Sequence, residues 1–261
     1  MKHLVSFMIF IFLFISICCS QEKTKKELDF KVNIETDESL IDSLDKESRM
    51  LLTSARLIQE QDYYNAIDLL NQIIEANPSL AEAYCNRGIA YRMINNYDKA
   101  VENYNKAIEI NPNIGEPYLS RGIINILIEN LSAALKDFNK AIEINPNDEN
   151  AYCNRGIVNR RLGFYNQALQ DYSKAISLNS DYLYAYQNRF ILYAQLGKNE
   201  EALQDCNKMI ELNPLDGYVF YLRGILYYNG LNDISKACKD WLKSVELGYD
   251  KAKSEYLKNC K

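Results

Sequence analysis

Large and small apolar residues recur along most of this chain with a period of 34 positions. They stand at positions 4, 8 and 11 of each period and again at positions 20, 24 and 27, with a short polar segment between the two groups. A spacing of three or four residues places side chains on one face of an α-helix, so each period predicts a pair of helices. Because one pair cannot bury its apolar face alone, we expect neighbouring pairs to stack. The predicted repeats span residues 47–80, 81–114, 115–148, 149–182, 183–216 and 217–250.

Several columns of the repeat have a direct physical interpretation. Position 8 is glycine in four repeats and position 24 is usually aromatic, so two antiparallel helices can approach while a ring fills the space between them. Position 32 holds four of the five prolines. This position follows the second helix of the repeat, and a residue without an N–H cannot continue that helix. Position 15 holds Asn95, Gly163 or Gly197, which tolerate the left-handed backbone conformation where the first helix ends.

This pattern resembles the tetratricopeptide repeat (TPR), which has aromatic residues near positions 4, 11 and 24, Gly or Ala at 8, 20 and 27, and Pro at 32. The resemblance covers about 204 of the 261 residues. It implies an all-α TPR solenoid of helix-turn-helix repeats whose function is to bind other polypeptides. We expect residues 250–261 to form a helix that caps the last repeat.

Two repeats depart from the pattern at the paired columns. The first repeat is degenerate, with Ser54 at position 8 and Leu70 at position 24. The fifth has Phe190 at position 8 and Cys206 at position 24, so the large and the small residue have exchanged columns. Because these changes alter volume in opposite directions, we expect them to compensate.

A polar column accompanies the apolar ones. Position 7 is arginine in five repeats, and position 23 or its shifted equivalent is Asn103 in one of them and aspartate in the other four. The pairs are Arg87 and Asn103, Arg121 and Asp137, Arg155 and Asp171, Arg189 and Asp205, and Arg223 and Asp240. This match predicts a repeated structural ion pair or hydrogen bond, with ligand binding by the arginines as the alternative.

The resemblance also implies a concave groove lined by positions 2, 5, 9, 12 and 13 of the first helices. Tyrosine and arginine anchor many protein interfaces, so we predict a groove with a basic middle and an aromatic C-terminal end. The predicted groove residues are Asn86, Arg92, Asn154, Arg160, Arg161, Tyr184, Asn188, Tyr218, Tyr221 and Tyr228. The asparagines occupy position 6, as in TPR modules that clamp chaperone carboxylates, but the basic residues of that clamp are missing here.

The N-terminal segment predicts export. Lys2 precedes an apolar run over residues 4–17, followed by small residues, which is the order of a secretory signal; we assign residues 1–20 to it. Two fates remain open: cleavage that releases a soluble protein, or lipidation of Cys19 or Cys18. Residues 21–46 predict a charged flexible spacer. The expected location is periplasmic, outer-membrane-attached or secreted, because the chain resembles bacterial envelope TPR proteins.

Two of the cysteines predict a disulfide. If the last repeat ends near Leu247 and the capping helix begins near Asp250, Cys238 and Cys260 lie at similar distances from the turn between them. They would then face each other, and an exported protein can keep such a bond. The cysteines form no metal-binding motif outside the signal, so no metal is expected.

Composition narrows the class of function. The single histidine, His3, lies in the predicted signal, so a processed chain would have no Ser-His or Cys-His dyad. The net charge of −5 gives no basic footprint for nucleic acid, and no motif predicts a cofactor. We therefore predict a non-enzymatic scaffold or adaptor that binds a partner peptide or helix. A homo-oligomeric structural protein and a regulatory subunit of an envelope enzyme are the alternatives.

Overall fold

The computed structural model describes residues 46–260, which contain thirteen α-helices and no strand. The predicted all-α TPR fold is confirmed, since the helices form pairs, and pairs that follow one another within the same compact unit pack together. The described chain divides into two compact units at Pro146 and Asn147. The signal, the lipidation candidates Cys18 and Cys19, and nearly all of the predicted spacer lie outside the described residues.

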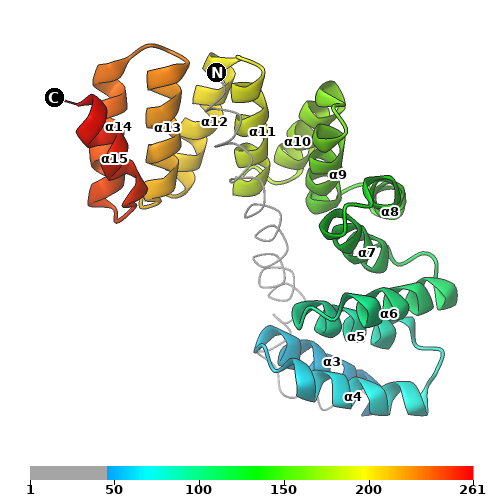
Figure 1. Ribbon diagram of the computed structural model, residues 1–261. Coiled ribbons are helices and arrows are strands. Elements are labelled where there is room, and N and C mark those ends of the chain that lie inside the picture. Colours follow the sequence, from blue (N-terminus) through cyan, green and yellow to red (C-terminus); the bar gives the residue numbers. More distant parts are fainter. Residues whose placement is uncertain (1–45, 261) are drawn as a thin grey trace. The chain divides into compact units, whose positions relative to one another are not determined.

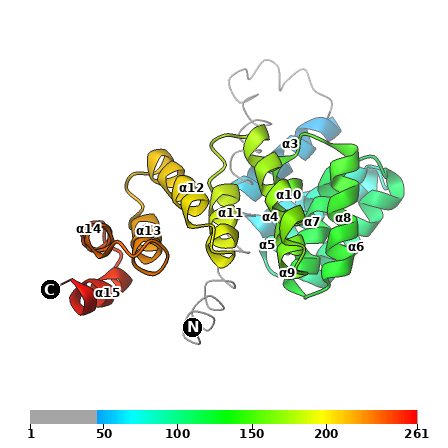
Figure 2. The same ribbon diagram turned by 90° about the horizontal axis from the view of Figure 1, so that it is seen from above.

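Each unit consists of helix pairs that contact the next pair in the chain (Figures 1 and 2). The helices of the first unit are α3 (Lys46–Gln59), α4 (Tyr63–Ala76), α5 (Ala81–Met93), α6 (Tyr97–Ile110), α7 (Gly115–Leu127) and α8 (Leu131–Ile144). Those of the second unit are α9 (Glu149–Arg161), α10 (Tyr165–Leu178), α11 (Leu183–Gln195), α12 (Asn199–Leu212), α13 (Gly217–Asn229), α14 (Ile234–Glu246) and α15 (Lys251–Asn259). No helix among them is long and apolar enough to cross a membrane.

The turn inside each of the first five pairs uses a left-handed residue at position 15. Asn95, Gly163 and Gly197 adopt φ values of 59°, 81° and 72°, which confirms the prediction for this column. Gln61 and Glu129 take the same conformation in the first and third repeats, with φ values of 65° and 62°. Their side chains make this conformation unfavourable by about 1 kcal/mol each, so the turn geometry is imposed by the packing of the pair.

Glycine at position 8 permits the close approach of the two helices in a pair. A Cβ atom built on Gly88 would lie 2.6 Å from the ring of Tyr104, and one on Gly122 would lie 2.7 Å from the ring of Phe138. The rings of Tyr104 and Phe138 are fully buried. A glycine on one helix and an aromatic ring on the other therefore form the core of these repeats.

The second unit ends in α15, which packs against α14. Ala252 is fully buried in this contact, whereas Leu257 is 61% exposed. The helix thus covers the end of the stack with a narrow apolar stripe and leaves most of its surface polar.

Candidate partner-binding site

The arginine column forms ion pairs in four repeats, as the sequence predicts. In the fifth repeat, Nε and Nη2 of Arg189 on α11 donate to the two carboxylate oxygens of Asp205 on α12, at 3.0 and 2.6 Å. Asp205 is 2% exposed, so this carboxylate has little access to water. The bidentate geometry is the strong form of an arginine–carboxylate contact. The column therefore holds the two helices of one repeat together.

The same arginines also reach the preceding repeat, which sequence reasoning missed. Nη1 of Arg189 donates to the hydroxyl of Ser173 on α10 at 2.9 Å. Nη1 of Arg223 makes the equivalent bond to Asn207 on α12 at 2.7 Å. The sequence indicates this contact, because position 25 is a short polar residue in each of the first five repeats. Each of these two guanidinium groups thus joins three helices.

An aromatic residue at position 4 completes the contact. The guanidinium carbon of Arg189 lies 5.7 Å from the ring centroid of Tyr186, and that of Arg223 lies 5.4 Å from that of Phe220. A cation over an aromatic face is attracted by the ring quadrupole. Because each of their three side-chain nitrogens makes a hydrogen bond and an aromatic ring lies against the guanidinium, these two arginines serve the fold.

Burial and hydrogen bonding shift the pKa values of these groups. Burial raises the pKa of Asp205, although its hydrogen bond and its attraction to Arg189 act in the opposite direction. The hydrogen bond to Asp240 raises the pKa of Arg223. Burial also raises the pKa of the Cys206 thiol to about 12. This thiol is therefore protonated at neutral pH and is a poor nucleophile.

Half of the predicted groove residues are buried, which corrects the expectation that all of them face a partner. The buried ones are Arg92, Asn154, Arg160, Asn188 and Tyr221. Asn154 and Asn188 turn back to their own helices, where their amide groups donate to the backbone oxygens of Asn150 and Tyr184. These five side chains cannot meet a partner without a rearrangement of their surroundings.

Tyr221 is covered because the chain after α14 folds over it. Its ring centroid lies 5.2 Å from that of Tyr249, and only 3% of the residue is exposed. Tyr218, one turn earlier on α13, lies 5.5 Å from the same ring and is partly exposed. Burial raises the pKa of Tyr218 to about 12, so its hydroxyl is neutral under physiological conditions.

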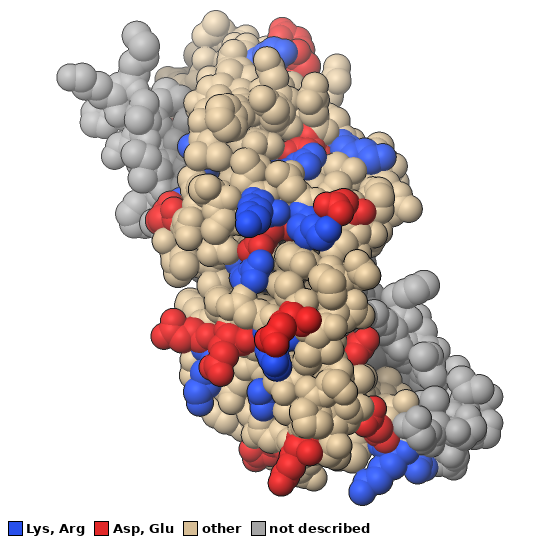
Figure 3. Space-filling view, turned by 90° about the vertical axis from the view of Figure 1, so that its right-hand side faces the viewer, with Lys and Arg blue, Asp and Glu red and all other residues tan. Residues whose placement is uncertain are grey.

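The other half of the predicted set is partly accessible. Asn86 lies on α5 in the first unit, whereas Arg161, Tyr184, Tyr218 and Tyr228 lie on α9, α11 and α13 of the second unit. Tyr228 rests on the buried Trp241, at 5.5 Å between ring centroids. The second unit thus presents arginine and tyrosine side chains on α9, α11 and α13, each of which is the first helix of its repeat. On the face drawn in Figure 3, acidic and basic side chains of the described residues are interspersed.

Cys238 on α14 and Cys260, directly after α15, form a disulfide with a Cα–Cα distance of 5.6 Å. The other described cysteines, Cys85, Cys153 and Cys206, are buried thiols outside the disulfide. Within residues 46–260 no cluster of three metal-ligating side chains is found.

Replacing Cys238 and Cys260 with serine is expected to loosen α15 while leaving the rest of the second unit folded. The bond closes a loop over a sequence separation of 22, for which chain entropy corresponds to about 3 kcal/mol. In a repeat stack such a loss stays local. Hydrogen exchange should show roughly a hundredfold loss of amide protection in residues 251–260, and α9 and α10 serve as the internal control. Unchanged protection of α15 would contradict this prediction.

Comparison with known families agrees with the paired-helix fold. One tetratricopeptide repeat model matches both residues 81–114 and residues 149–182, and a second one matches residues 185–214. A TPR repeat model matches residues 128–163. None of the curated proteins matches the chain.

Solved structures show the same architecture. MamA is 25% identical over 62% of this chain and 94% of its own, with a TM-score of 0.55. YrrB, described as a TPR protein with an unusual peptide-binding site, is 24% identical over 69% of this chain and 93% of its own, with a TM-score of 0.58. PilW, described as a type IV pilus biogenesis factor, is 17% identical over 82% of this chain and 100% of its own, with a TM-score of 0.72.

The paired helices and their packing define a helical repeat protein of the tetratricopeptide type. Tetratricopeptide repeat models thus match parts of the chain between residues 81 and 214, and the solved structures share its fold. Proteins of this fold are typically non-catalytic scaffolds that bind other proteins or peptides.

Proposed function

We propose that this protein is a non-enzymatic adaptor that holds an extended segment or a helix of a partner protein against the first helices of its second unit. The observation that carries the proposal is the partly accessible set Arg161, Tyr184, Tyr218 and Tyr228, which lies on α9, α11 and α13. Tyrosine provides a large contact area at low entropic cost, and arginine provides directed hydrogen bonds. A stack of helices presents such residues at regular intervals, which suits an elongated ligand.

The proposed setting is the cell envelope, where the adaptor would assist assembly or regulation of a larger machine. The N-terminal sequence, with its basic residue, apolar run and candidate lipidation sites Cys18 and Cys19, supports export. The similarity in fold to PilW is consistent with this setting. Lipid attachment at either cysteine would place the repeats at a membrane surface.

Site-specific photo-crosslinking in cells tests the binding surface. With a benzophenone amino acid in place of Tyr184, we expect a covalent adduct to a partner protein. The same replacement at Tyr64 on α4, which is 72% exposed, is the matched control for a reactive group on an accessible tyrosine position. An adduct at position 184 that disappears on Arg161→Ala substitution supports the proposal. Equal adducts at both positions, or a product consisting only of two copies of this chain, would refute it.

A further inference from the structure

One arginine of the column lacks the carboxylate that the other four possess. In the third repeat, Nε and Nη2 of Arg121 on α7 bind the two oxygens of Asp137 on α8, at 3.1 and 2.6 Å. In the second repeat the equivalent residue is Asn103, and Nε of Arg87 donates to its single amide oxygen at 2.7 Å. An amide offers one acceptor where a carboxylate offers two, and it carries no charge.

The remaining contacts of Arg87 do not supply the missing charge. Its Nη1 donates to the side-chain oxygen of Asn71 at 2.7 Å, which is also a neutral amide. Within residues 46–260, Nη2 of Arg87 makes no hydrogen bond and Arg87 forms no ion pair. Asn103 is 4% exposed, and its amide nitrogen donates to the backbone oxygen of Lys99 at 2.7 Å, so its orientation is fixed. Arg87 therefore retains a full positive charge with donor capacity to spare.

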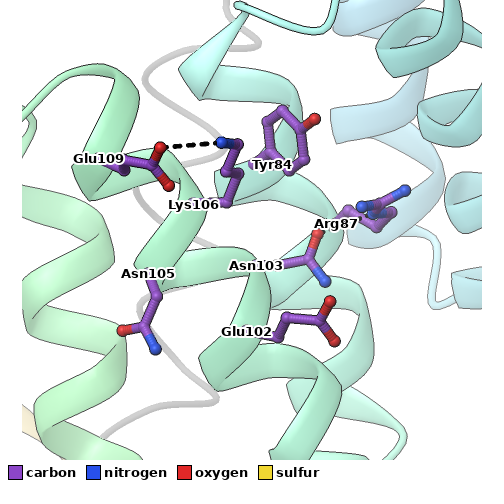
Figure 4. Close-up of a pocket in the computed structure, with 7 residues that line it drawn as sticks. All are labelled: Tyr84, Arg87, Glu102, Asn103, Asn105, Lys106 and Glu109. Carbon is purple, nitrogen blue, oxygen red and sulfur yellow. Dashed lines mark hydrogen bonds and ion pairs between the residues drawn. The ribbon is translucent and has the colours of Figure 1, made fainter.

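This unneutralised arginine lines an open cleft of about 390 Å³ between α5 and α6 (Figure 4). The ring of Tyr84 stacks near its guanidinium, at 5.3 Å from centroid to Cζ. Lys106 supplies a second cation, held by Glu109 at 3.1 Å, and Glu102 also lines the cleft. Two cations and two carboxylates leave the cleft close to neutral, which favours a ligand of single negative charge over a doubly charged phosphate.

We propose that this cleft binds a carboxylate side chain of an acidic peptide, with Arg87 as the principal donor. Each of the four other arginines in the column binds an aspartate carboxylate of its own repeat. In the second repeat the partner peptide would supply this carboxylate, since the repeat has no aspartate at that position. The site uses residues of α5 and α6 in the first unit. It is independent of the tyrosine and arginine surface of the second unit, and either proposal can hold without the other.

The test is a titration of the full chain, labelled with ¹⁵N at arginine side chains, with the capped peptide acetyl-Gly-Glu-Gly-amide. We expect a saturable shift of the Arg87 Nε–H signal in the millimolar range of peptide, with Arg189 and Arg223 unmoved because their carboxylates are internal. Asn103→Asp should weaken binding about tenfold or more, since it installs the ion pair that the other repeats have. That variant should fold normally. Asp137→Asn in the third repeat should produce the reverse effect at Arg121.

Three results would overturn the proposal. The first is an Arg87 signal that does not move at high peptide concentration, or that moves equally with the neutral peptide acetyl-Gly-Gln-Gly-amide. The second is an Asn103→Asp variant that binds as tightly as the wild type. The third is a response to inorganic phosphate without a response to the Glu peptide. Crosslinking at Tyr184 is a separate readout, so failure of this site leaves the proposed adaptor surface untouched.

Discussion

Replacing Arg189 with alanine is expected to lower the free energy of unfolding by about 3 kcal/mol at neutral pH. The substitution removes both donors from the carboxylate of Asp205 and the hydrogen bond to Ser173 on the preceding repeat. Asp205 is 2% exposed, so water cannot replace the lost donors without a local rearrangement. Urea denaturation followed by circular dichroism measures the loss.

The loss of unfolding free energy in Arg189→Ala should depend on pH, and the pKa of Asp205 sets the direction of this dependence. Burial raises the pKa of Asp205 above its ordinary value of 3.8, and Arg189 opposes that rise. Without Arg189 the folded-state pKa rises further, while the unfolded-state pKa stays near 3.8. A raised folded pKa means that the folded protein takes up a proton more readily than the unfolded chain. The Arg189→Ala variant should therefore show its largest loss of unfolding free energy at pH values above the raised pKa of Asp205. The loss should become smaller as the pH falls from that pKa towards 3.8.

Asp205→Asn is the matched control for this prediction. The second repeat already contains the arginine–asparagine version of the contact, with Nε of Arg87 bound to Asn103. The control should thus keep one hydrogen bond, leave no buried carboxylate and cost about 1 kcal/mol. If both variants lost the same amount, or if the Arg189→Ala deficit did not change with pH, the buried carboxylate would not be the cause.

The period of the sequence was enough to predict the fold, because the columns encode pairwise contacts. Glycine at position 8 and a ring at position 24 are complementary in size, and the structure places Gly88 against Tyr104 as that match requires. Arginine at position 7 and aspartate at position 23 are complementary in charge, and Arg121 binds Asp137. Both contacts join the two helices of one repeat, so a single unit of sequence contains both members of each pair.

The groove could be predicted only in part, because burial depends on side chains from outside the helix concerned. Position in a repeat gives the direction of a side chain but not what covers it. Tyr221 occupies a predicted groove position, yet Tyr249, which follows the last repeat pair, packs on its ring. Asn188 was assigned by analogy with asparagines that bind ligands, but its amide group donates to the backbone oxygen of Tyr184. A hydrogen bond to the preceding turn is a common alternative for asparagine in a helix.

The second large effect on stability is expected in the fifth repeat, where the large and the small core residue have exchanged columns. Phe190 on α11 and Cys206 on α12 are 5% and 0% exposed, and they occupy the positions at which the neighbouring repeats place glycine against a ring. Phe190→Gly should cost about 4 kcal/mol, since it leaves a cavity and adds a glycine to a helix. Cys206→Tyr should cost about 2 kcal/mol through overpacking. The double variant restores the common arrangement, and we expect it to recover about 3 kcal/mol relative to the sum of the single losses.

The reciprocal exchange in the third repeat provides the control for this cycle. Gly122 and Phe138 form the usual pair there, with the ring 2.7 Å from where a Cβ would lie. Gly122→Phe alone places two rings in one space, and Phe138→Cys alone leaves a void, whereas the double variant copies the fifth repeat. Denaturant titrations of both cycles should show coupling of the same sign, because total volume is conserved across the pair of columns. Additive losses in both repeats would mean that Phe190 and Cys206 are accommodated by separate neighbours, and that their shared departure from the pattern is not compensation.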